Sequence, residues 1–164
     1  LTALLILTLQ YPKADAKNQK NIVDFYLKNT AHINNWDLVD LSAPNILGAW
    51  LTDKNKGTLY RLAKSKNLWE RRISIIATYA FIKQNQFDET LKIASILLSD
   101  KHDLVHKAAG WMLREVGKRK IAALEKFLNQ YSLKMPRVML RYAIEKMSPE
   151  KRKFYLLTDC KARP

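Results

Sequence analysis

The sequence predicts an all-α protein in which antiparallel helices form a stack. Its 164 residues include only four glycines and five prolines, so few positions favour a turn. Apolar residues recur with the spacing of an amphipathic helix, and no segment alternates apolar and polar residues as a strand does. A chain of this length supports one hydrophobic core, and we expect a single domain over residues 1–164.

Eleven segments have helical spacing, and the residues between them are typical of helix ends. Pro12 stops the first segment, Ser42 precedes the fourth, and Asp53 and Asp100 separate later ones. Pro149 follows a serine and suits the first position of a helix. The expected helices cover residues 2–11, 18–29, 36–41, 44–50, 58–65, 68–85, 87–98, 105–116, 121–131, 136–147 and 149–156.

Some of these helices recur as a degenerate repeat. The segments RRISIIATYAFI from Arg71, KAAGWMLREVG from Lys107 and RVMLRYAIEKM from Arg137 each begin with a basic residue and continue as an apolar helix. Their starts are 36 and 30 residues apart, and a step of 35 residues back from the first reaches Trp36. A period of about 30–40 residues with two helices per unit is typical of an α-solenoid of HEAT-like repeats, whose inner helices line a concave groove.

The charge of the chain is large and uneven. It carries 29 lysines and arginines against 15 aspartates and glutamates, a net charge of +14. Residues 101–164 have 16 basic and 6 acidic groups, net +10, whereas residues 1–100 have 13 and 9, net +4. Such a clustered surplus favours a polyanionic partner, and we expect duplex DNA in a basic groove. A solvated basic surface is the alternative.

Other features exclude several classes of protein. The single cysteine, Cys160, allows neither an internal disulfide nor a metal-binding cysteine pair, and indicates a reducing cytoplasm. No glycine-rich phosphate loop is present, which argues against nucleotide hydrolysis. The opening LTALLILTLQ is too short to span a membrane and lacks the basic start of a secretion signal. We expect it to be a core helix entered partway, in a chain that lacks N-terminal residues of its domain.

One expected helix carries a basic stripe that includes a tryptophan. Lys107, Trp111, Arg114 and Lys118 share one helix side, because each lies about one or two turns from the next. The opposite side is apolar and consists of Val105, Ala108, Ala109, Met112 and Val116. The cations are candidate DNA-phosphate ligands, and the indole can contact a sugar or a base. In the alternative interpretation, Trp111 is a core residue and the cations form a solvated face.

Arginines on two further helices are candidates for the same role. Arg71 and Arg72 are adjacent and point about 100° apart around one helix. Arg141 lies in the last repeated helix. A planar guanidinium binds a phosphate through two N–H groups, which makes all three candidate phosphate ligands. A surface ion pair with Glu70 is the alternative for either of the first two.

The stretch INNWDLVD adds a carboxylate to these basic helices. Asp40 follows Trp36 by four residues, so a carboxylate and an indole project from one helix face. A carboxylate opposes phosphate binding and helps only where positive charge develops, as in an oxocarbenium-like sugar beside a cationic base. We expect Asp40 to be the only acidic member among the groove cations. A helix cap at Asp37 or Asp40 is the alternative.

Four motifs together resemble the AlkD-type DNA alkylation repair glycosylases. They are NNWDLVD, LWERRISIIAT, HKAAGWMLREVGK and MPRVMLRYAIEK, in this order, and the resemblance covers residues 18–157. It implies a solenoid of HEAT-like repeats that excises positively charged 3-alkyladenine and 7-alkylguanine from duplex DNA. It also implies that no metal or cofactor takes part, and that the lesion stays stacked rather than flipping out.

The resemblance also implies roles for individual residues. Asp40 would be the catalytic carboxylate beside the deoxyribose, and Trp36 and Trp111 would contact the damaged nucleotide. Arg72 would hold a phosphate near the lesion, with Arg71 as its rival for that role. Further phosphate candidates are Arg114, Lys118, Lys107 and Arg141. We expect a monomer, because the groove must clasp DNA. Two alternatives stay open: a binder of damaged or branched DNA without activity, and a helical scaffold for an acidic protein partner.

Overall fold

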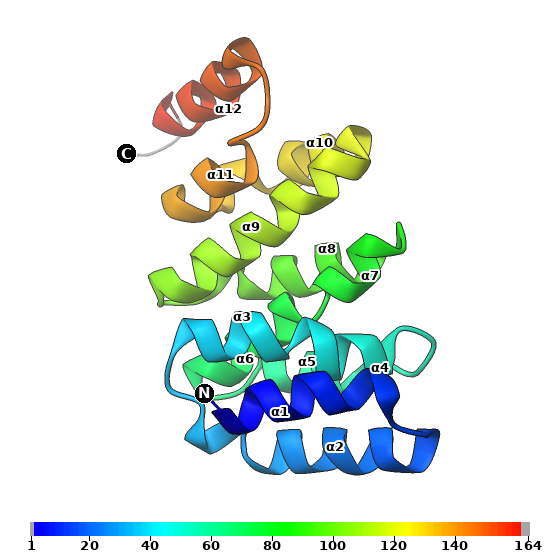
Figure 1. Ribbon diagram of the computed structural model, residues 1–164. Helices are drawn as coiled ribbons and strands as arrows, with labels where there is room; N and C mark the ends of the chain where they lie inside the picture. The colour runs from blue at the N-terminus through cyan, green and yellow to red at the C-terminus, as the bar shows by residue number, and fades with distance from the viewer. Residues whose placement is uncertain (1, 162–164) are drawn as a thin grey trace.

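A computed structural model describes residues 2–161, with side chains described as far as Leu157. Within that range the chain is helical and has no strand, which confirms the predicted all-α class (Figure 1). The α-helices are α1 (Thr2–Gln10), α2 (Ala16–Lys28), α3 (Trp36–Ser42), α4 (Ala49–Leu51), α5 (Gly57–Ala63), α6 (Leu68–Ile76), α7 (Tyr79–Lys83), α8 (Asp88–Ile96), α9 (Asp103–Arg119), α10 (Ile121–Tyr131), α11 (Arg137–Ala143) and α12 (Pro149–Lys161). The side chain of Cys160 lies outside the described residues.

Helices α3 and α4 are joined by a widened turn rather than by a loop. The π-helical segment η3 (Pro44–Gly48) continues the helix between them, and the Gly48 N–H donates to the Ala43 carbonyl, five residues back, at 2.8 Å. Pro44 has no N–H to give to the carbonyl four residues earlier, so the helix accommodates it with one extra residue. The two separate helices predicted for residues 36–41 and 44–50 are therefore one nearly continuous run, and its wide turn begins one turn after Asp40.

The long helix predicted for residues 68–85 is instead divided into α6 and α7. The break falls at Ala77 and Thr78, where the Thr78 N–H bonds to the Ile75 carbonyl three residues back and the Thr78 hydroxyl donates to the same oxygen. η3 packs directly on this break. A methyl group at Gly48 would lie 2.2 Å from the Ala77 carbonyl oxygen, so only glycine permits this approach.

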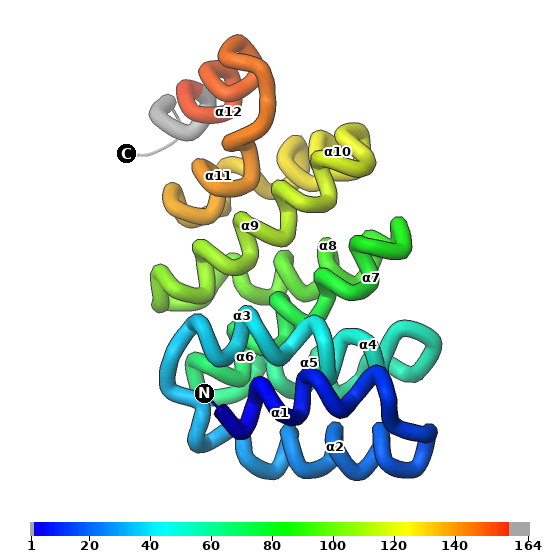
Figure 2. The backbone as a smooth tube through the Cα atoms, viewed as in Figure 1, coloured from blue at the N-terminus to red at the C-terminus, as the bar shows by residue number. Residues whose placement is uncertain are grey.

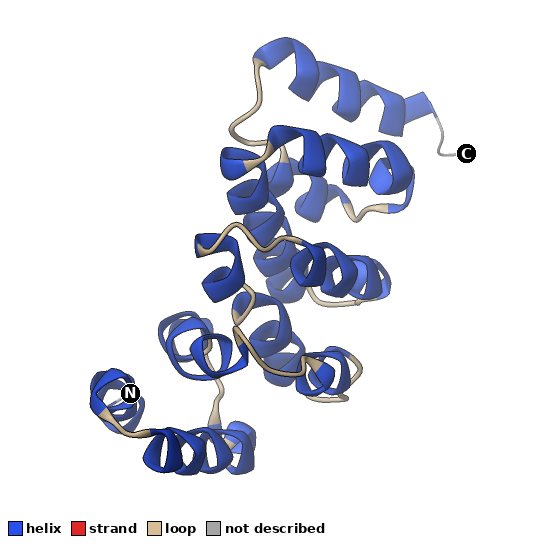
Figure 3. Ribbon diagram, turned by 90° about the vertical axis from the view of Figure 1, so that its right-hand side faces the viewer, coloured by secondary structure: helices blue, strands red, loops and turns tan. Residues whose placement is uncertain are grey.

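The helices follow one another through the stack in chain order. α3 packs on α1 and α6, α6 packs on α9, and α9 packs on α11. α5 packs on α6, and α8 and α10 pack on α9. These three helices therefore pack beside the row formed by α1, α3, α6, α9 and α11. Figure 2 follows the backbone from α1 and α2 at one end to α12 at the other, and Figure 3 shows the stack from its side.

The core lies between successive helices and is best developed around α9. The predicted apolar side of this helix is confirmed, because Val105, Ala108, Ala109, Met112 and Val116 are all at most 1% exposed. The prediction that the opening segment is a core helix is wrong. No side chain of α1 is buried, and Leu5, Ile6 and Leu9 are 40%, 48% and 66% exposed. The reason is position: α1 lies at the edge of the stack and packs on α3, η3 and its own connection to α2.

No helix in the described part of the chain is both long enough and apolar enough to cross a lipid bilayer.

Candidate functional site

The carboxylate singled out by the sequence is held by an arginine from another helix. Asp40 lies in α3, and Arg72 lies in the middle of α6. Arg72 Nε donates to Asp40 Oδ1 at 3.0 Å, and Arg72 Nη2 donates to Asp40 Oδ2 at 2.8 Å. Two parallel bonds of this kind fix the plane and orientation of both groups. The Asp40 side chain keeps 17% of its surface accessible, so the carboxylate is fixed but still open to a ligand.

Arg72 connects three helices and is itself only 5% exposed. Its Nη1 donates to the Leu104 carbonyl at the start of α9. Asp40 and Leu104 thus take three of its five N–H groups, and two N–H groups remain for any phosphate. Among the described residues, the main contact of Arg72 is therefore its pair of hydrogen bonds to Asp40, which fixes that carboxylate. Its predicted contact with a DNA phosphate stays a prediction.

Arg71, the neighbour in sequence, makes a separate ion pair away from Asp40. Its Nε and Nη2 donate to the two oxygens of Asp100 at 2.5 and 3.3 Å, and its Nη1 donates to the carbonyls of Ser65 and Lys66. Burial acts to raise the pKa of the Asp100 carboxyl, but the bonds from Arg71 and from the His102 N–H outweigh it and leave that pKa below its ordinary value. Arg72, and not Arg71, is thus the arginine beside Asp40.

Trp36 stands at the start of α3 with an open side chain. It is 52% exposed, which is unusual for an indole because large aromatic side chains are mostly buried. Asn35 precedes the helix, and Asp37 lies in its first turn, where a negative charge suits the helix dipole. Asp40 lies one turn further on and bonds to Arg72, so the alternative that Asp40 is a helix cap is wrong.

Trp111 is oriented by a glutamate on its own helix. Its Nε1 donates to Glu115 Oε1 at 3.2 Å, and Lys118 Nζ donates to the same oxygen at 2.7 Å. The ring of Tyr79 lies 6.2 Å from the Trp111 ring, between centroids, and tilts by 39°. The indole is half-buried, so its position is fixed by a bond on one edge and a ring on one side.

Arg114 is paired with two carboxylates. Its Nη1 donates to Glu145 Oε2 in the connection between α11 and α12, and its Nε lies 3.5 Å from Glu115 Oε1. Burial acts to raise the pKa of Glu145, but the bond and the charge of Arg114 outweigh it and lower that pKa. Glu115 and Glu145 therefore stand among the predicted phosphate ligands. The expectation that Asp40 would be the only acidic group there is wrong.

The last two predicted phosphate ligands line a separate cavity of about 600 Å³ between α9, α11 and α12. We call it the basic pocket and define it by four cations, Lys107, Arg137, Arg141 and Arg152. Lys107 comes from the predicted basic stripe of α9, and Arg141 comes from α11. The nine predicted residues thus fall into three groups around Asp40, Trp111 and the basic pocket, with Arg71 apart from them.

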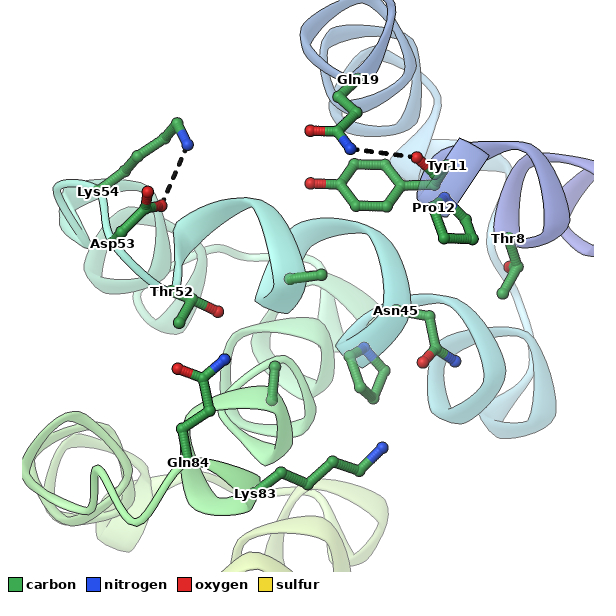
Figure 4. Close-up of a pocket in the computed structure, with 13 residues that line it drawn as sticks. Thr8, Tyr11, Pro12, Gln19, Asn45, Thr52, Asp53, Lys54, Lys83 and Gln84 are labelled. Carbon is green, nitrogen blue, oxygen red and sulfur yellow. Dashed lines mark hydrogen bonds and ion pairs between the residues drawn. The ribbon is translucent and has the colours of Figure 1, made fainter. Parts of the chain in front are cut away.

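A larger cavity of about 840 Å³ begins one turn after Asp40, along the π-helical segment (Figure 4). Polar side chains line it from three sides, among them Gln19, Asn45 and Lys83. Gln19 Nε2 donates to the Tyr11 carbonyl at 3.3 Å, which ties α2 to the end of α1. None of the nine residues predicted from the sequence lines this cavity.

The sequence interpretation missed three features of the site. Glu115 was detectable, since it lies four residues after Trp111 and three before Lys118 on one helix. Glu145 and the Leu104 carbonyl were not detectable, because their partners lie on other elements: Glu145, between α11 and α12, meets Arg114 of α9, and Leu104 of α9 meets Arg72 of α6. No sequence pattern states which carbonyl faces a buried arginine.

Comparison with known proteins gives two findings. A family model described as "DNA alkylation repair enzyme" matches residues 1–147. Among solved structures, the chain is similar to one described as "Predicted DNA alkylation repair enzyme from Enterococcus faecalis", with a TM-score of 0.57 and 17% identity over 90% of this chain and 77% of that chain. At such low identity the structural likeness shows a shared fold. The search of curated proteins found no match.

Proposed function

The chain belongs to the DNA alkylation repair enzyme family, and from that premise we propose that it hydrolyses the N-glycosidic bond of positively charged alkylated purines in duplex DNA. The expected substrates are 3-alkyladenine and 7-alkylguanine. The stacked helices act as one HEAT-like solenoid over residues 1–164, and their inner faces form a basic groove that holds the duplex. A monomer suffices, since a single groove provides every group named below.

One observation carries this proposal, the carboxylate of Asp40 fixed by the buried guanidinium of Arg72. An anion that must oppose DNA binding is oriented by two bonds and remains partly accessible. Such a group stabilises positive charge that develops on a sugar without reorganising during the reaction. A binding protein gains nothing from this arrangement, whereas a glycosylase does.

In the reaction, the bond between C1′ and the purine nitrogen breaks, and its electron pair moves to the cationic base. The base leaves neutral, and C1′ carries the positive charge as an oxocarbenium-like sugar. Asp40 lies beside that sugar and stabilises the charge. A water molecule then adds to C1′ and releases its proton, and the products are an abasic site and the free base.

The remaining site residues bind and orient the DNA. The exposed indole of Trp36 and the half-buried indole of Trp111 contact the backbone and sugar of the damaged nucleotide. The two remaining N–H groups of Arg72 reach a phosphate at the lesion, and Arg114 and Lys118 exchange their glutamate partners for phosphates. Neither cavity described above is lined by Asp40 or by these indoles. The proposal includes a lesion that stays in the stack, as the resemblance to the AlkD-type glycosylases implies.

The test is base release from a duplex that contains 7-methylguanine, measured for the wild type and for Asp40→Asn. We expect the variant to release base about 10–100-fold more slowly, because it loses a preorganised negative charge. Its DNA affinity should hold or rise. An unchanged rate in a folded variant contradicts the proposed role of Asp40.

One observation favours a second candidate, a binder of damaged DNA without activity. Arg72 neutralises much of the charge of Asp40, and this reduces the field that an oxocarbenium would experience. That candidate predicts salt-sensitive DNA binding without base release from the wild type.

A further inference from the structure

We propose that the basic pocket binds a backbone phosphate of the DNA duplex several base pairs from the lesion. This inference rests on the proposed function for its partner, the duplex, but not on the chemistry at Asp40. It assigns a binding role to Arg152 of α12, a helix that begins after the last residue matched by the family model.

Three cations of the pocket have no acidic partner among the described residues. Lys107, Arg141 and Arg152 make no ion pair there, whereas Arg71, Arg72, Arg114 and Lys118 all make one. Arg141 and Arg152 are exposed, and Lys107 is half-buried. Like charges around one cavity repel each other, and an anion between them relieves this repulsion. Their convergence therefore indicates a site for an anion.

The one acidic residue of the pocket does not cancel this charge. Glu145 lines the cavity, but its carboxylate bonds to Arg114 Nη1 and lies 3.5 Å from Lys146 Nζ. Both of these cations lie outside the lining of the pocket. Glu145 is thus compensated from outside, and the pocket keeps a positive charge.

Contacts with two other helices fix α12, so Arg152 is held in place. The Tyr155 hydroxyl donates to Asn129 Oδ1 of α10 at 3.0 Å, and Lys151 pairs with Glu125 of the same helix. Arg137 Nη1 of α11 donates to the Leu156 carbonyl at 2.9 Å. Since α12 is tied to both α10 and α11, the pocket is preformed.

The position of the pocket fits a phosphate at a distance from the lesion. From Asp40 the stack continues through Arg72 to the start of α9, and Lys107 lies one turn further along that helix. Packed helix axes lie about 8–10 Å apart, so two to three layers separate α3 from the pocket by about 16–30 Å. Successive base pairs rise about 3.4 Å, and this span corresponds to roughly 5–9 of them.

The experiment compares Arg141→Ala and Arg152→Ala with a matched control, Arg61→Ala. Arg61 is an exposed arginine of α5 without an ion pair among the described residues. Affinity for an undamaged duplex of about 25 base pairs, longer than the roughly 5–9 base pairs of the span, is measured from low to moderate salt. Each pocket variant should bind several-fold more weakly, and its log-log salt slope should fall by about 0.9, whereas the control should match the wild type. Pocket variants that behave like Arg61→Ala overturn the proposal.

A second arm separates the DNA backbone from a free phosphate. Inorganic phosphate is titrated calorimetrically into the wild type and into Arg152→Ala. We expect no saturable binding at the pocket, that is, no binding to the wild type that is lost in Arg152→Ala. If such binding occurs while duplex affinity is unchanged in the variants, the site takes a free anion and the proposal is wrong. Because the duplex is undamaged, this test does not depend on glycosylase activity. If the pocket variants lose affinity but the wild type releases no base from alkylated DNA, the pocket proposal holds and the proposed activity is refuted.

Discussion

The Asp40–Arg72 pair and the basic pocket use the same side-chain chemistry in opposite ways. Arg72 is 5% exposed and donates its N–H groups to a carboxylate and a carbonyl. Arg141 and Arg152 are exposed and make no ion pair among the described residues. A buried guanidinium must be paired, because an unpaired charge away from water is strongly destabilising. An exposed guanidinium has no such requirement. In the first region arginine therefore fixes the carboxylate that we propose to be catalytic, and in the second its guanidinium groups stay accessible to the anion that we propose.

The Trp111 region lies between these two cases. Arg114 and Lys118 are accessible but already paired with Glu145 and Glu115. A phosphate that binds there must displace a glutamate, whereas a phosphate in the basic pocket displaces only water. We therefore expect a phosphate to bind at the basic pocket with a smaller cost than at Arg114 and Lys118.

The largest expected effect tests the buried pair. Arg72→Met keeps most of the side-chain volume but leaves Asp40 without its partner. We expect the free energy of unfolding to fall by about 3 kcal/mol, the lower end for a broken buried pair, because part of Asp40 reaches solvent. Urea unfolding measures this loss. Adding Asp40→Asn should recover part of it, since the unpaired charge is then gone.

If the double variant is as unstable as Arg72→Met alone, the loss comes from packing or from the Leu104 carbonyl, and the contrast between the two regions loses its electrostatic basis. The matched comparison is a single variant, Arg141→Met. Arg141→Met should leave the unfolding midpoint unchanged, because its charge is exposed and without an ion pair among the described residues.

A smaller effect is expected for Glu115→Gln. Glutamine still accepts the bond from Trp111 Nε1, but it no longer pairs with Lys118 or Arg114. DNA affinity should rise by about two- to fivefold, because a phosphate then no longer has to break a partly exposed ion pair, and such a pair contributes up to about 1 kcal/mol. Fluorescence anisotropy with an undamaged duplex measures it. Glu89→Gln on α8 changes the net charge equally, and an equal rise there would attribute the effect to net charge rather than to the site.

The smallest effect concerns Arg71 and Asp100 and appears only in acid. The pKa of Asp100 is lower in the folded chain than its ordinary value near 3.9. The unfolded chain therefore takes up the proton first, and the stability contributed by Asp100 is present above that ordinary value and lost as the pH falls through the folded value. Between pH 6 and pH 2 the free energy of unfolding should fall less steeply in Asp100→Asn than in the wild type. The two slopes should differ by less than about 1.4 kcal/mol per pH unit. Parallel curves would mean that Asp100 titrates alike in both states.

Much of the fold was predictable because helices leave a local pattern. The spacing of apolar residues predicted α10 to the residue and α9 within three residues at each end, and the family was recognised from four motifs and confirmed by the match over residues 1–147. One failure is a place where packing overrides that pattern. The break in helix 68–85 lies where η3 packs on Ala77, so it depends on tertiary contact. The wide turn follows from Pro44, at which the sequence pattern predicted the start of a separate helix.

The sequence by itself determined the helical class, the family, the charge of the C-terminal third and the position of Asp40 one turn after Trp36. These depend on composition and on the helical period, and both can be read along the chain. Only the tertiary structure decided which arginine meets Asp40, where Glu145 binds and which cations have no acidic partner among the described residues. Arg71 and Arg72 are adjacent and chemically identical, yet about 100° of helix rotation sends one to Asp100 and the other to Asp40. The choice depends on which helices pack on α6, and no local pattern records that.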